Sequence, residues 1–273
     1  MNQKLLVAVT FFFVDSRLQI LKRVLEEVAE LAPYLKLLLI TNSSLGKDIF
    51  ELKKIIPNTL DHEIHVPSLL GHPYLLTWSH LDLFRDHFFG PDNFSHYLYL
   101  EDDLLFTKAN FHYWLESREI LRPYNLIPAF MRYELKLGSA VRYATDMTHK
   151  ITFSRLKKIE YKKGSYYLSL PQPYQGMYLL DRDLMGEHLK GGSSNPDCKG
   201  FGGIREKAAQ GLIYAGVPRG FLNRHALKYD AVARRVDSAA LVHHSTNSYA
   251  DDPSVKFAKI PVDALIKHRI LGF

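Results

Sequence analysis

Apolar and polar positions follow two different periods over the first 105 residues of the chain. The segment KLLVAVTFF (4–12) is a nearly continuous apolar run, which is typical of a strand buried on both faces of a parallel sheet. Apolar residues then recur at helical spacing from Leu18 to Leu31, and Ser16 and Gln19 have capping-box spacing at the start of that helix. The sequence therefore opens with a predicted strand followed by an amphipathic helix.

Three more strands are predicted before residue 105. They are LKLLLI (35–40), EIHV (63–66) and HYLYL (96–100). Pro73 stands where the first turn of a helix tolerates proline, and YLLTWSHLDLFRDHFF after it has a helical pattern. The alternation of strands and helices predicts an α/β fold, with a mostly parallel sheet and helices on both of its faces.

The pattern changes after residue 125 to short β-like runs. These runs are 127–135, 150–156, 165–170 and 174–180, and they are followed by DRDLMGEHL, the loop 190–203, a helical segment 204–214 and the strand ALVHH (240–244). Their spacing predicts hairpins in a smaller mixed sheet, and we expect two halves of one domain, 1–125 and 126–273. The loop rich in glycine and serine is either a lid or a plain surface loop.

Composition limits the class of protein. With 273 residues, of which 47% are hydrophobic, the chain is long enough to build a sizeable core. No run reaches the roughly 18 uncharged apolar residues of a membrane span, and no small-residue cleavage site follows the first apolar stretch. Cys198 is the single cysteine, which excludes an internal disulfide and a cysteine-based zinc site. We expect a soluble, cytoplasmic protein.

The formal net charge of +6 and the aromatic content of 12% fit a ligand that carries phosphate, or an anionic membrane surface. No dense stripe of lysine and arginine of the kind that binds duplex DNA is present. We therefore expect no nucleic-acid partner.

Three consecutive carboxylates interrupt the apolar run YLYLEDDLLFT (97–107). Glu101, Asp102 and Asp103 directly follow a predicted buried strand. Thr10 lies near the end of the first predicted strand, and Asn42 lies just after the second. All five residues are therefore expected at the carboxyl edge of the sheet, where ligands bind. Like charges at a buried strand end cost free energy unless a positive charge gathers there. A divalent cation that also binds a diphosphate is one answer; a solvated strand end is the other.

In this arrangement the chain resembles glycosyltransferases of the GT-A type, which use nucleotide-sugar donors. The resemblance rests on the strand and helix order of residues 4–245 and on the EDD form of the acidic motif. It implies a GT-A-like (Rossmann-like) fold in which 1–125 bind the donor and 126–273 bind the acceptor. It also implies Mn²⁺ or Mg²⁺ between the donor diphosphate and Asp103, which makes Asp103 a catalytic residue, with Glu101 and Asp102 directed at the sugar or nucleoside.

The same resemblance assigns roles to three later side chains. His243 and His244 stand at a strand end where the family often supplies a histidine to the metal, although a hydrogen-bonded structural histidine is the alternative. Glu206 stands behind the glycine-rich loop, where many inverting members place the general base. The family commonly has an acidic pair there and this chain has Arg205 and Glu206, so Glu206 can also be a first-turn acid stabilised by the helix dipole.

Further substrate contacts are expected on both sides of the acidic motif. His72 precedes Pro73, and His80 lies one or two turns into the predicted helix that precedes the acidic strand. In the GT-A layout this helix lines the donor site, so both histidines could touch the nucleotide or sugar. The stretch Tyr174, Gln175 and Gly176 offers a small residue at a sheet edge, where a sugar can approach the backbone. Arg205 is a further candidate for contact with the diphosphate or the acceptor.

The sequence thus predicts a metal-dependent glycosyltransferase that moves a sugar from a nucleotide-sugar donor to a hydroxyl of a glycan or lipid-linked acceptor, in the synthesis of a surface polysaccharide or glycolipid. Its charge permits peripheral association with the inner face of a membrane. A nucleotidyltransferase of similar half-fold is one alternative, although such enzymes usually have a glycine-rich loop bearing lysine or arginine after the first strand, and TFFFVDSRLQ has no glycine. A glycan-binding module without catalysis is the other.

Overall fold

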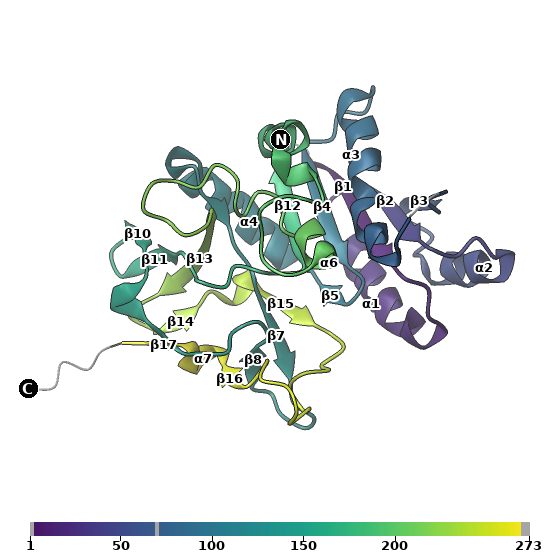
Figure 1. Ribbon diagram of the computed structural model, residues 1–273. Coiled ribbons are helices and arrows are strands. Elements are labelled where there is room, and N and C mark those ends of the chain that lie inside the picture. The colour runs from purple at the N-terminus through teal and green to yellow at the C-terminus, as the bar shows by residue number, and fades with distance from the viewer. Residues whose placement is uncertain (1–2, 69–70, 269–273) are drawn as a thin grey trace, which may run out of the picture. The chain divides into compact units, whose positions relative to one another are not determined.

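The structure is a computed structural model that describes residues 3–68 and 71–268 (Figure 1). Its described residues form two compact units. Unit 1 comprises the described residues up to Lys108 together with Gly176–Ala215, and unit 2 comprises Ala109–Gln175 with the described residues from Gly216 onward. This division differs from the boundary expected near residue 125, because the chain leaves unit 1 after Lys108 and returns to it at Gly176.

Unit 1 is built on one sheet with the strand order β12-β4-β1-β2-β3. The strands are β1 (Lys4–Phe11), β2 (Tyr34–Thr41), β3 (Asp61–His65), β4 (His96–Glu101) and β12 (Met177–Asp181). β1 to β4 are parallel to one another, and β12 runs antiparallel to β4. The mostly parallel sheet and its four predicted strands are confirmed, whereas the run 174–180, expected in the smaller mixed sheet, is the edge strand of this one.

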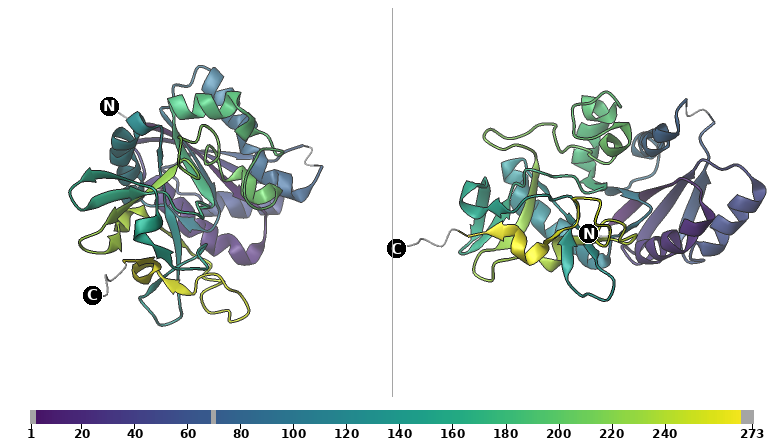
Figure 2. Two further views of the ribbon diagram at one scale, coloured as in Figure 1. Left: turned by 60° about the vertical axis from the view of Figure 1, so that its left-hand side comes forward. Right: turned by 60° about the horizontal axis from the view of Figure 1, so that its bottom comes forward.

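Helices cover both faces of the sheet of unit 1, as the apolar pattern predicted. α1 and α2 lie on one face, and α3 and α5 lie on the other (Figure 2). The helical segments of unit 1 are η1 (Asp15–Arg17), α1 (Leu18–Ala29), α2 (Gly46–Ile55), η2 (Pro73–Trp78), α3 (His80–Phe89), α5 (Arg182–Lys190), η5 (Gly192–Ser194) and α6 (Ile204–Ala208), and the short strand β5 is Leu104–Leu105.

Two local expectations for these helices are wrong. The capping box of Ser16 and Gln19 is not formed, because Ser16 lies inside η1 and the N-cap position of α1 is Arg17, without a side-chain cap. The helix expected over 204–214 ends after Ala208. Gly211 beyond it has a φ of +51°, and a Cβ atom at this position would lie 2.9 Å from the ring of Tyr178, so this backbone conformation and close approach both require glycine.

The acidic motif lies where the order of the parallel strands in the sheet reverses. β2 and β3 follow on one side of β1, whereas β4 lies on its other side, with Thr10 opposite Glu101 in the register of the β1 and β4 pair. In open α/β sheets, ligands collect beyond the carboxyl ends of the strands at such a reversal. The segments that follow β1 and β4 are therefore where a ligand of unit 1 is expected.

Unit 2 has a mixed β architecture with one long helix, α4 (Lys108–Leu121), which the sequence analysis did not anticipate. One sheet has the order β10-β11-β13-β14 with β6 beside β13, and a second contains β16-β8-β7-β15. The strands are β6 (Ile127–Pro128), β7 (Met131–Leu135), β8 (Arg142–Ala144), β9 (Ile151–Thr152), β10 (Lys158–Lys162), β11 (Ser165–Leu168), β13 (His225–Asp230), β14 (Arg235–Val236), β15 (Leu241–His244), β16 (Ile260–Pro261) and β17 (Ile266–Lys267). The remaining helical segments are η3 (Arg122–Tyr124), η4 (Phe153–Arg155), η6 (Ser238–Ala240) and α7 (Val262–Leu265).

The core of unit 2 joins α4 to the first of these sheets. Leu121, Leu126, Tyr167 and Ala226 form a buried cluster, and the hydroxyl of Tyr167 lies 2.9 Å from Ser117 Oγ. β15 pairs in parallel with β7, which pairs antiparallel with β8, so the expectation of a mixed sheet is confirmed. None of the helices in the described part of the chain has both the length and the hydropathy that crossing a membrane requires.

Candidate functional site at the carboxyl edge of the parallel sheet

The chain itself supplies a positive charge to the acidic motif. Arg17 ends η1, in the segment that follows β1, and its Nη2 lies 3.1 Å from Asp102 Oδ2 and 3.0 Å from Asp103 Oδ2. The same nitrogen donates to Asp102 Oδ1 at 3.2 Å. One guanidinium thus bridges two neighbouring carboxylates at the point in unit 1 where the strand order reverses.

At Asp102, the effect of burial outweighs that of this bridge. Asp102 is 9% exposed, and burial together with the Asp103 carboxylate raises its pKa from 3.8 to about 7, although Arg17 opposes the shift. Glu101 adds a further increase of the pKa. The Arg17 guanidinium does not offset burial and the neighbouring carboxylates, so at neutral pH the buried Asp102 is poised between its protonated and ionised forms. An additional cation at this place would favour the ionised form.

The carboxylates fit part of a divalent-cation site. Among the described residues, no group of three or more histidine, cysteine, aspartate or glutamate side chains is placed to hold a metal. Mg²⁺, however, is usually bound by one or two carboxylates and completes its shell with water and substrate phosphates. The buried Oδ2 of Asp102 accepts no hydrogen bond from the described residues, and it forms an ion pair with Arg17. Asp102 and Asp103 therefore suit a cation that arrives together with a phosphate chain.

Thr10 and Asn42 lie at the strand ends where they were expected, and both are used to build this edge. Thr10 is 6% exposed, and its Oγ1 lies 2.8 Å from the hydroxyl of Tyr99 on β4. Burial raises the pKa of Tyr99, so this phenol stays protonated. Asn42 Oδ1 accepts a hydrogen bond of 2.7 Å from the backbone of Phe13 and so fastens the segment that leads to Arg17.

His80 lies in the core of unit 1 rather than at its surface. It is fully buried, its Nδ1 lies 2.6 Å from the carbonyl of Thr77, and its Nε2 lies 2.6 Å from the hydroxyl of Tyr178. Its ring also stacks on Tyr99 with centroids 4.1 Å apart. Burial lowers its pKa to about 3, so the imidazole is neutral. The structure gives this histidine a packing role and no access to a ligand.

His72 is exposed and opens η2. Its backbone is extended, with φ −145° and ψ 140°, as the following Pro73 predicted, and its Nδ1 accepts a hydrogen bond of 3.2 Å from the amide of Tyr74. Trp78 ends η2 and is buried, and its Nε1 donates to the carbonyl of Ile204 at 2.7 Å. The indole thereby fastens η2 to α6, where Glu206 is found.

Glu206 has structural contacts at both carboxylate oxygens. Its Oε2 accepts from the amide of Gly203 at 2.9 Å, and its Oε1 accepts from Arg205 Nη2 at 2.9 Å. Partial burial acts to raise the pKa of Glu206, but backbone hydrogen bonds and the Arg205 guanidinium outweigh it, and the net shift is downward. A carboxylate in this state is a cap of the helix start, and it becomes a stronger base only if Arg205 moves away. The general-base role of Glu206 stays a prediction.

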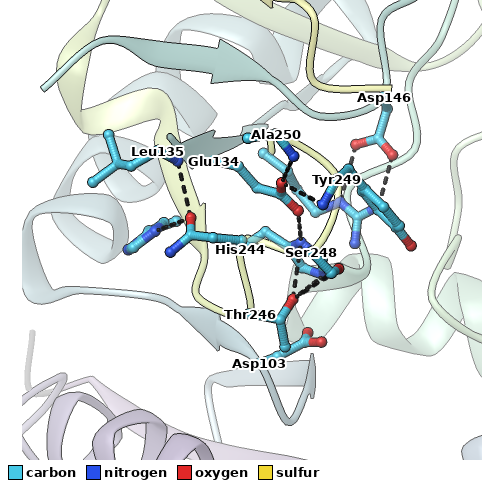
Figure 3. Close-up of polar contacts among 12 residues, drawn as sticks. Asp103, Glu134, Leu135, Asp146, His244, Thr246, Ser248, Tyr249 and Ala250 are labelled. Carbon is cyan, nitrogen blue, oxygen red and sulfur yellow. Dashed lines mark hydrogen bonds and ion pairs between the residues drawn. The ribbon is translucent and has the colours of Figure 1, made fainter. Parts of the chain in front are cut away.

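The two late histidines of unit 2 have different surroundings. His244 is buried, and its Nδ1 lies 2.6 Å from Oε1 of the fully buried Glu134, whose Oε2 accepts from the amides of Tyr249 and Ala250 (Figure 3). His243 stacks on Tyr133, and its Nε2 lies 3.0 Å from the side-chain oxygen of Asn247. A carboxylate on Nδ1 is the contact that orients metal-binding histidines in many proteins, and it also stabilises structural ones. Metal binding by His244 or His243 stays a prediction.

Tyr174, Gln175 and Gly176 stand where the chain passes from unit 2 to unit 1. The Gln175 side chain is buried and its Oε1 accepts from the amide of Phe130 at 2.8 Å, and the guanidinium of Arg132 lies over the ring of Tyr174 at 4.8 Å. Gly176 has a φ of +65°, and its carbonyl accepts from the amide of Glu101 at 3.2 Å. The expected substrate contacts of these three residues stay predictions, and their observed contacts are within the protein.

Sequence reasoning missed Arg17, which contacts the acidic motif of unit 1, and Glu134, which contacts His244 in unit 2. A signal for Arg17 was present, because it is the first basic residue after the first strand and the segments that follow parallel strands gather at one edge of the sheet. No such signal exists for Glu134, which lies 110 residues from His244 in the chain.

Comparisons with known proteins give a distant structural likeness. No protein-family model matches the chain, and a search of curated protein sequences finds no match either. A similar solved structure is 4-diphosphocytidyl-2C-methyl-D-erythritol synthase from Anaerococcus prevotii DSM 20548, with 13% identity, a TM-score of 0.37, and coverage of 76% of this chain and 82% of that one. Another is CMP:2-keto-3-deoxy-manno-octonic acid synthetase complexed with CTP, with 12% identity, a TM-score of 0.39, and coverage of 68% and 77%.

By their names, both enzymes handle cytidine nucleotides, and they belong to the class of the nucleotidyltransferase alternative rather than to the glycosyltransferases. At these identities and TM-scores, the likeness assigns no activity to this chain.

Proposed function

We propose that the protein is a nucleotide-dependent transferase, and that the phosphate chain of the nucleotide binds with Mn²⁺ or Mg²⁺ at the carboxyl ends of β1 and β4. The observation that carries this proposal is the buried carboxyl of Asp102, whose pKa burial and the Asp103 carboxylate raise to about 7 although Arg17 lies 3.1 Å away. Such a cluster costs folding free energy, and a site for a cation and a phosphate is the chemistry that uses it.

Each residue of the cluster has a part in this proposal. Asp102 and Asp103 would hold the cation, which supplies charge stabilisation for the leaving phosphate. Arg17 would then exchange carboxylate oxygens for phosphate oxygens, because its guanidinium suits both kinds of acceptor. Thr10 and Asn42 position the strand ends and the segment that leads to Arg17.

For the reaction itself we favour glycosyl transfer. The bond between the sugar carbon and the nucleoside diphosphate breaks, the acceptor oxygen bonds to that carbon, and the proton of the acceptor hydroxyl passes to a base, for which Glu206 is the candidate. The acceptor would be a glycan or a lipid-linked hydroxyl. Supporting this choice, the segment 12–17 after β1 contains no glycine, whereas loops that surround triphosphates with backbone amides are usually glycine-rich.

Nucleotidyl transfer is the second candidate, and Arg17 is the observation that favours it. Enzymes of that class usually carry a lysine or arginine after the first strand to bind the triphosphate, and Arg17 occupies such a place and reaches the acidic motif. In that reaction an oxygen of the second substrate bonds to the α-phosphorus of the nucleoside triphosphate, the bond from this phosphorus to the β-phosphate breaks, and pyrophosphate leaves.

Calorimetric titration of nucleoside diphosphates, triphosphates and nucleotide sugars, with and without Mn²⁺, tests the shared part of the proposal. We expect one nucleotide to bind the wild type only with the cation, and Asp103→Asn to weaken that binding at least about tenfold, since a charge-assisted contact is removed. Asp61→Asn, which changes an exposed acid of β3, is the matched control and should bind as the wild type does. Binding that ignores both the cation and Asp103 would refute the site.

Phosphorus NMR of the reaction products separates the two candidates. Release of a nucleoside diphosphate from a nucleotide sugar supports glycosyl transfer. Release of pyrophosphate from a nucleoside triphosphate supports nucleotidyl transfer and removes the reason to expect a sugar donor.

A further inference from the structure

Two hairpin turns of unit 2 lie side by side and form one tip. The turn between β10 and β11 contains Lys163 and Gly164, and the turn between β13 and β14 spans 231–234. β11 and β13 are antiparallel neighbours, and the amide of Ala231 donates to the carbonyl of Gly164 at 2.8 Å (Figure 1). We call residues 162–164 and 231–235 the paired hairpin tip.

The paired hairpin tip carries a concentrated positive charge. Its four basic side chains are all exposed, and they are Lys162, Lys163, Arg234 and Arg235. The two acids beside them cap the turns: Glu160 accepts from the amide of Gly164 at 3.0 Å, and Asp230 Oδ1 accepts from the amides of Val232 and Ala233 at 2.9 Å each. The acids thus determine the shape of the turns, and the cations extend into solvent. With Glu160 and Asp230 counted, the tip and its flanking acids have a formal net charge of +2, against +6 for the whole chain.

An apolar side chain stands among these cations. Val232 is 82% exposed, although valine is usually buried. It lies against Gly164, where an added Cβ atom would come within 2.8 Å of Val232 Cγ2, and Gly164 has a φ of +77° that favours glycine. The valine therefore contacts the backbone of the neighbouring turn at Gly164, while most of its side chain is exposed in the same tip as the four cations.

We propose that the paired hairpin tip docks on the surface of a lipid bilayer that contains anionic lipids. Lysine and arginine side chains would bind the headgroups, and Val232 would enter the boundary between headgroups and acyl chains. A soluble polyanion would use the cations but would gain little from an exposed valine, which is why a bilayer is the partner that the combination fits. This inference does not depend on the proposed transferase activity.

Sedimentation of the full-length protein with vesicles tests the proposal, using phosphatidylcholine alone and phosphatidylcholine mixed with phosphatidylglycerol. We expect binding to the anionic vesicles only, weakened by salt because the Debye length shortens. The variant K162E/K163E/R234E/R235E should lose binding on the order of 100-fold or more, since each basic residue near an anionic surface contributes several-fold to the affinity. Thermal unfolding of each variant confirms that it is folded.

A matched control and a second variant keep the test decisive. K22E/R23E/K47E/K53E makes the same change of net charge on exposed residues of α1 and α2 and should keep binding to within a few-fold. V232S keeps every charge and should weaken vesicle binding several-fold while leaving binding to dextran sulfate unchanged. The proposal is overturned if the wild type does not bind anionic vesicles, if the control loses binding as the tip variant does, or if dextran sulfate binds as well as vesicles and V232S changes neither.

Discussion

Two buried carboxylate clusters of this protein are arranged in opposite ways. In unit 2, Glu134 is fully buried and both of its oxygens are satisfied, one by His244 and the other by two backbone amides. In unit 1, Asp102 is nearly as buried, but it shares the Arg17 guanidinium with Asp103 and its pKa is raised to about 7. The first cluster is complete in hydrogen bonds, whereas the second gains if a further cation arrives. Burial of a charge alone therefore does not nominate a binding site, whereas a buried carboxyl with a raised pKa makes Asp102 a candidate for one.

The largest effect is expected from removing the carboxylate of the complete cluster. Glu134→Ala leaves His244 and two backbone amides without their acceptor, and should lower the free energy of unfolding by about 3–5 kcal/mol. Urea denaturation measures it. Glu116→Ala, at an exposed acid of α4, should change it by less than about 0.5 kcal/mol. A loss for Glu134→Ala no larger than that of the control would remove the distinction between the two clusters.

At the incomplete cluster, the expected effect depends on pH. A carboxyl whose folded-state pKa is raised contributes stability that is fully present below the unfolded value of 3.8 and is lost as the pH rises towards about 7. Asp102→Asn removes this dependence. The free energy of unfolding of the variant, relative to that of the wild type, should therefore rise by on the order of 4 kcal/mol between about pH 4 and about pH 8.

The difference between wild type and variant is the informative quantity for Asp102. Burial lowers the pKa of His80, His188 and His225 to about 3, so their contribution changes in the opposite direction and stability rises with pH between about 3 and 6.5. Urea denaturation of both proteins across this range cancels the histidine contribution. A difference that does not vary with pH would show that Asp102 is ionised normally.

A smaller effect is expected from removing the shared cation. Arg17→Met takes away two ion pairs from carboxylates that stay buried, but the arginine side chain is 34% exposed and solvent screens part of the interaction. We expect a loss of about 1–2 kcal/mol at neutral pH. The loss should shrink in acid, where Asp102 is protonated, and equal losses in urea denaturation at about pH 4 and about pH 8 would contradict it.

The smallest effect is expected from an exchange that preserves the donor of the complete cluster. His244→Gln can still donate to Glu134, so stability should fall by about 1 kcal/mol, whereas His244→Phe removes the donor at Oε1 of the buried carboxylate and should cost about 3 kcal/mol. Thermal unfolding ranks the two variants. Equal losses would show that ring packing against Tyr249 matters more than the hydrogen bond.

The sequence was sufficient to predict the elements whose apolar residues follow a clear pattern. β1 to β4 follow from apolar runs, and the place of Thr10, Asn42 and the acidic motif follows from the rule that parallel strands end at one edge. β12 could not be assigned to its sheet, because an apolar run does not reveal which strand it pairs with, and its partner β4 lies some 80 residues earlier in the chain.

The side-chain contacts of the site residues were harder to predict from the sequence than their positions in the fold. Nothing in the pattern around His80 distinguishes a ligand-facing histidine from one that donates to or accepts from Tyr178 inside the core. The same is true of Glu206, whose two oxygens are engaged by Gly203 and Arg205. Side-chain contacts depend on distances between segments, and periodicity does not contain them.

The return of the chain to unit 1 determines the order in which the protein can form during synthesis. β4 is finished at Glu101, but its antiparallel neighbour β12 begins only at Met177, after α4 and the first half of unit 2 have been made. Until then, one side of β4 is an open strand edge with the apolar side chains Tyr97, Leu98, Tyr99 and Leu100, the kind of edge to which other chains attach. This edge of a nascent chain therefore stays open to aggregation until β12, which ends at Asp181, has left the ribosome, although folding of N-terminal parts usually comes first.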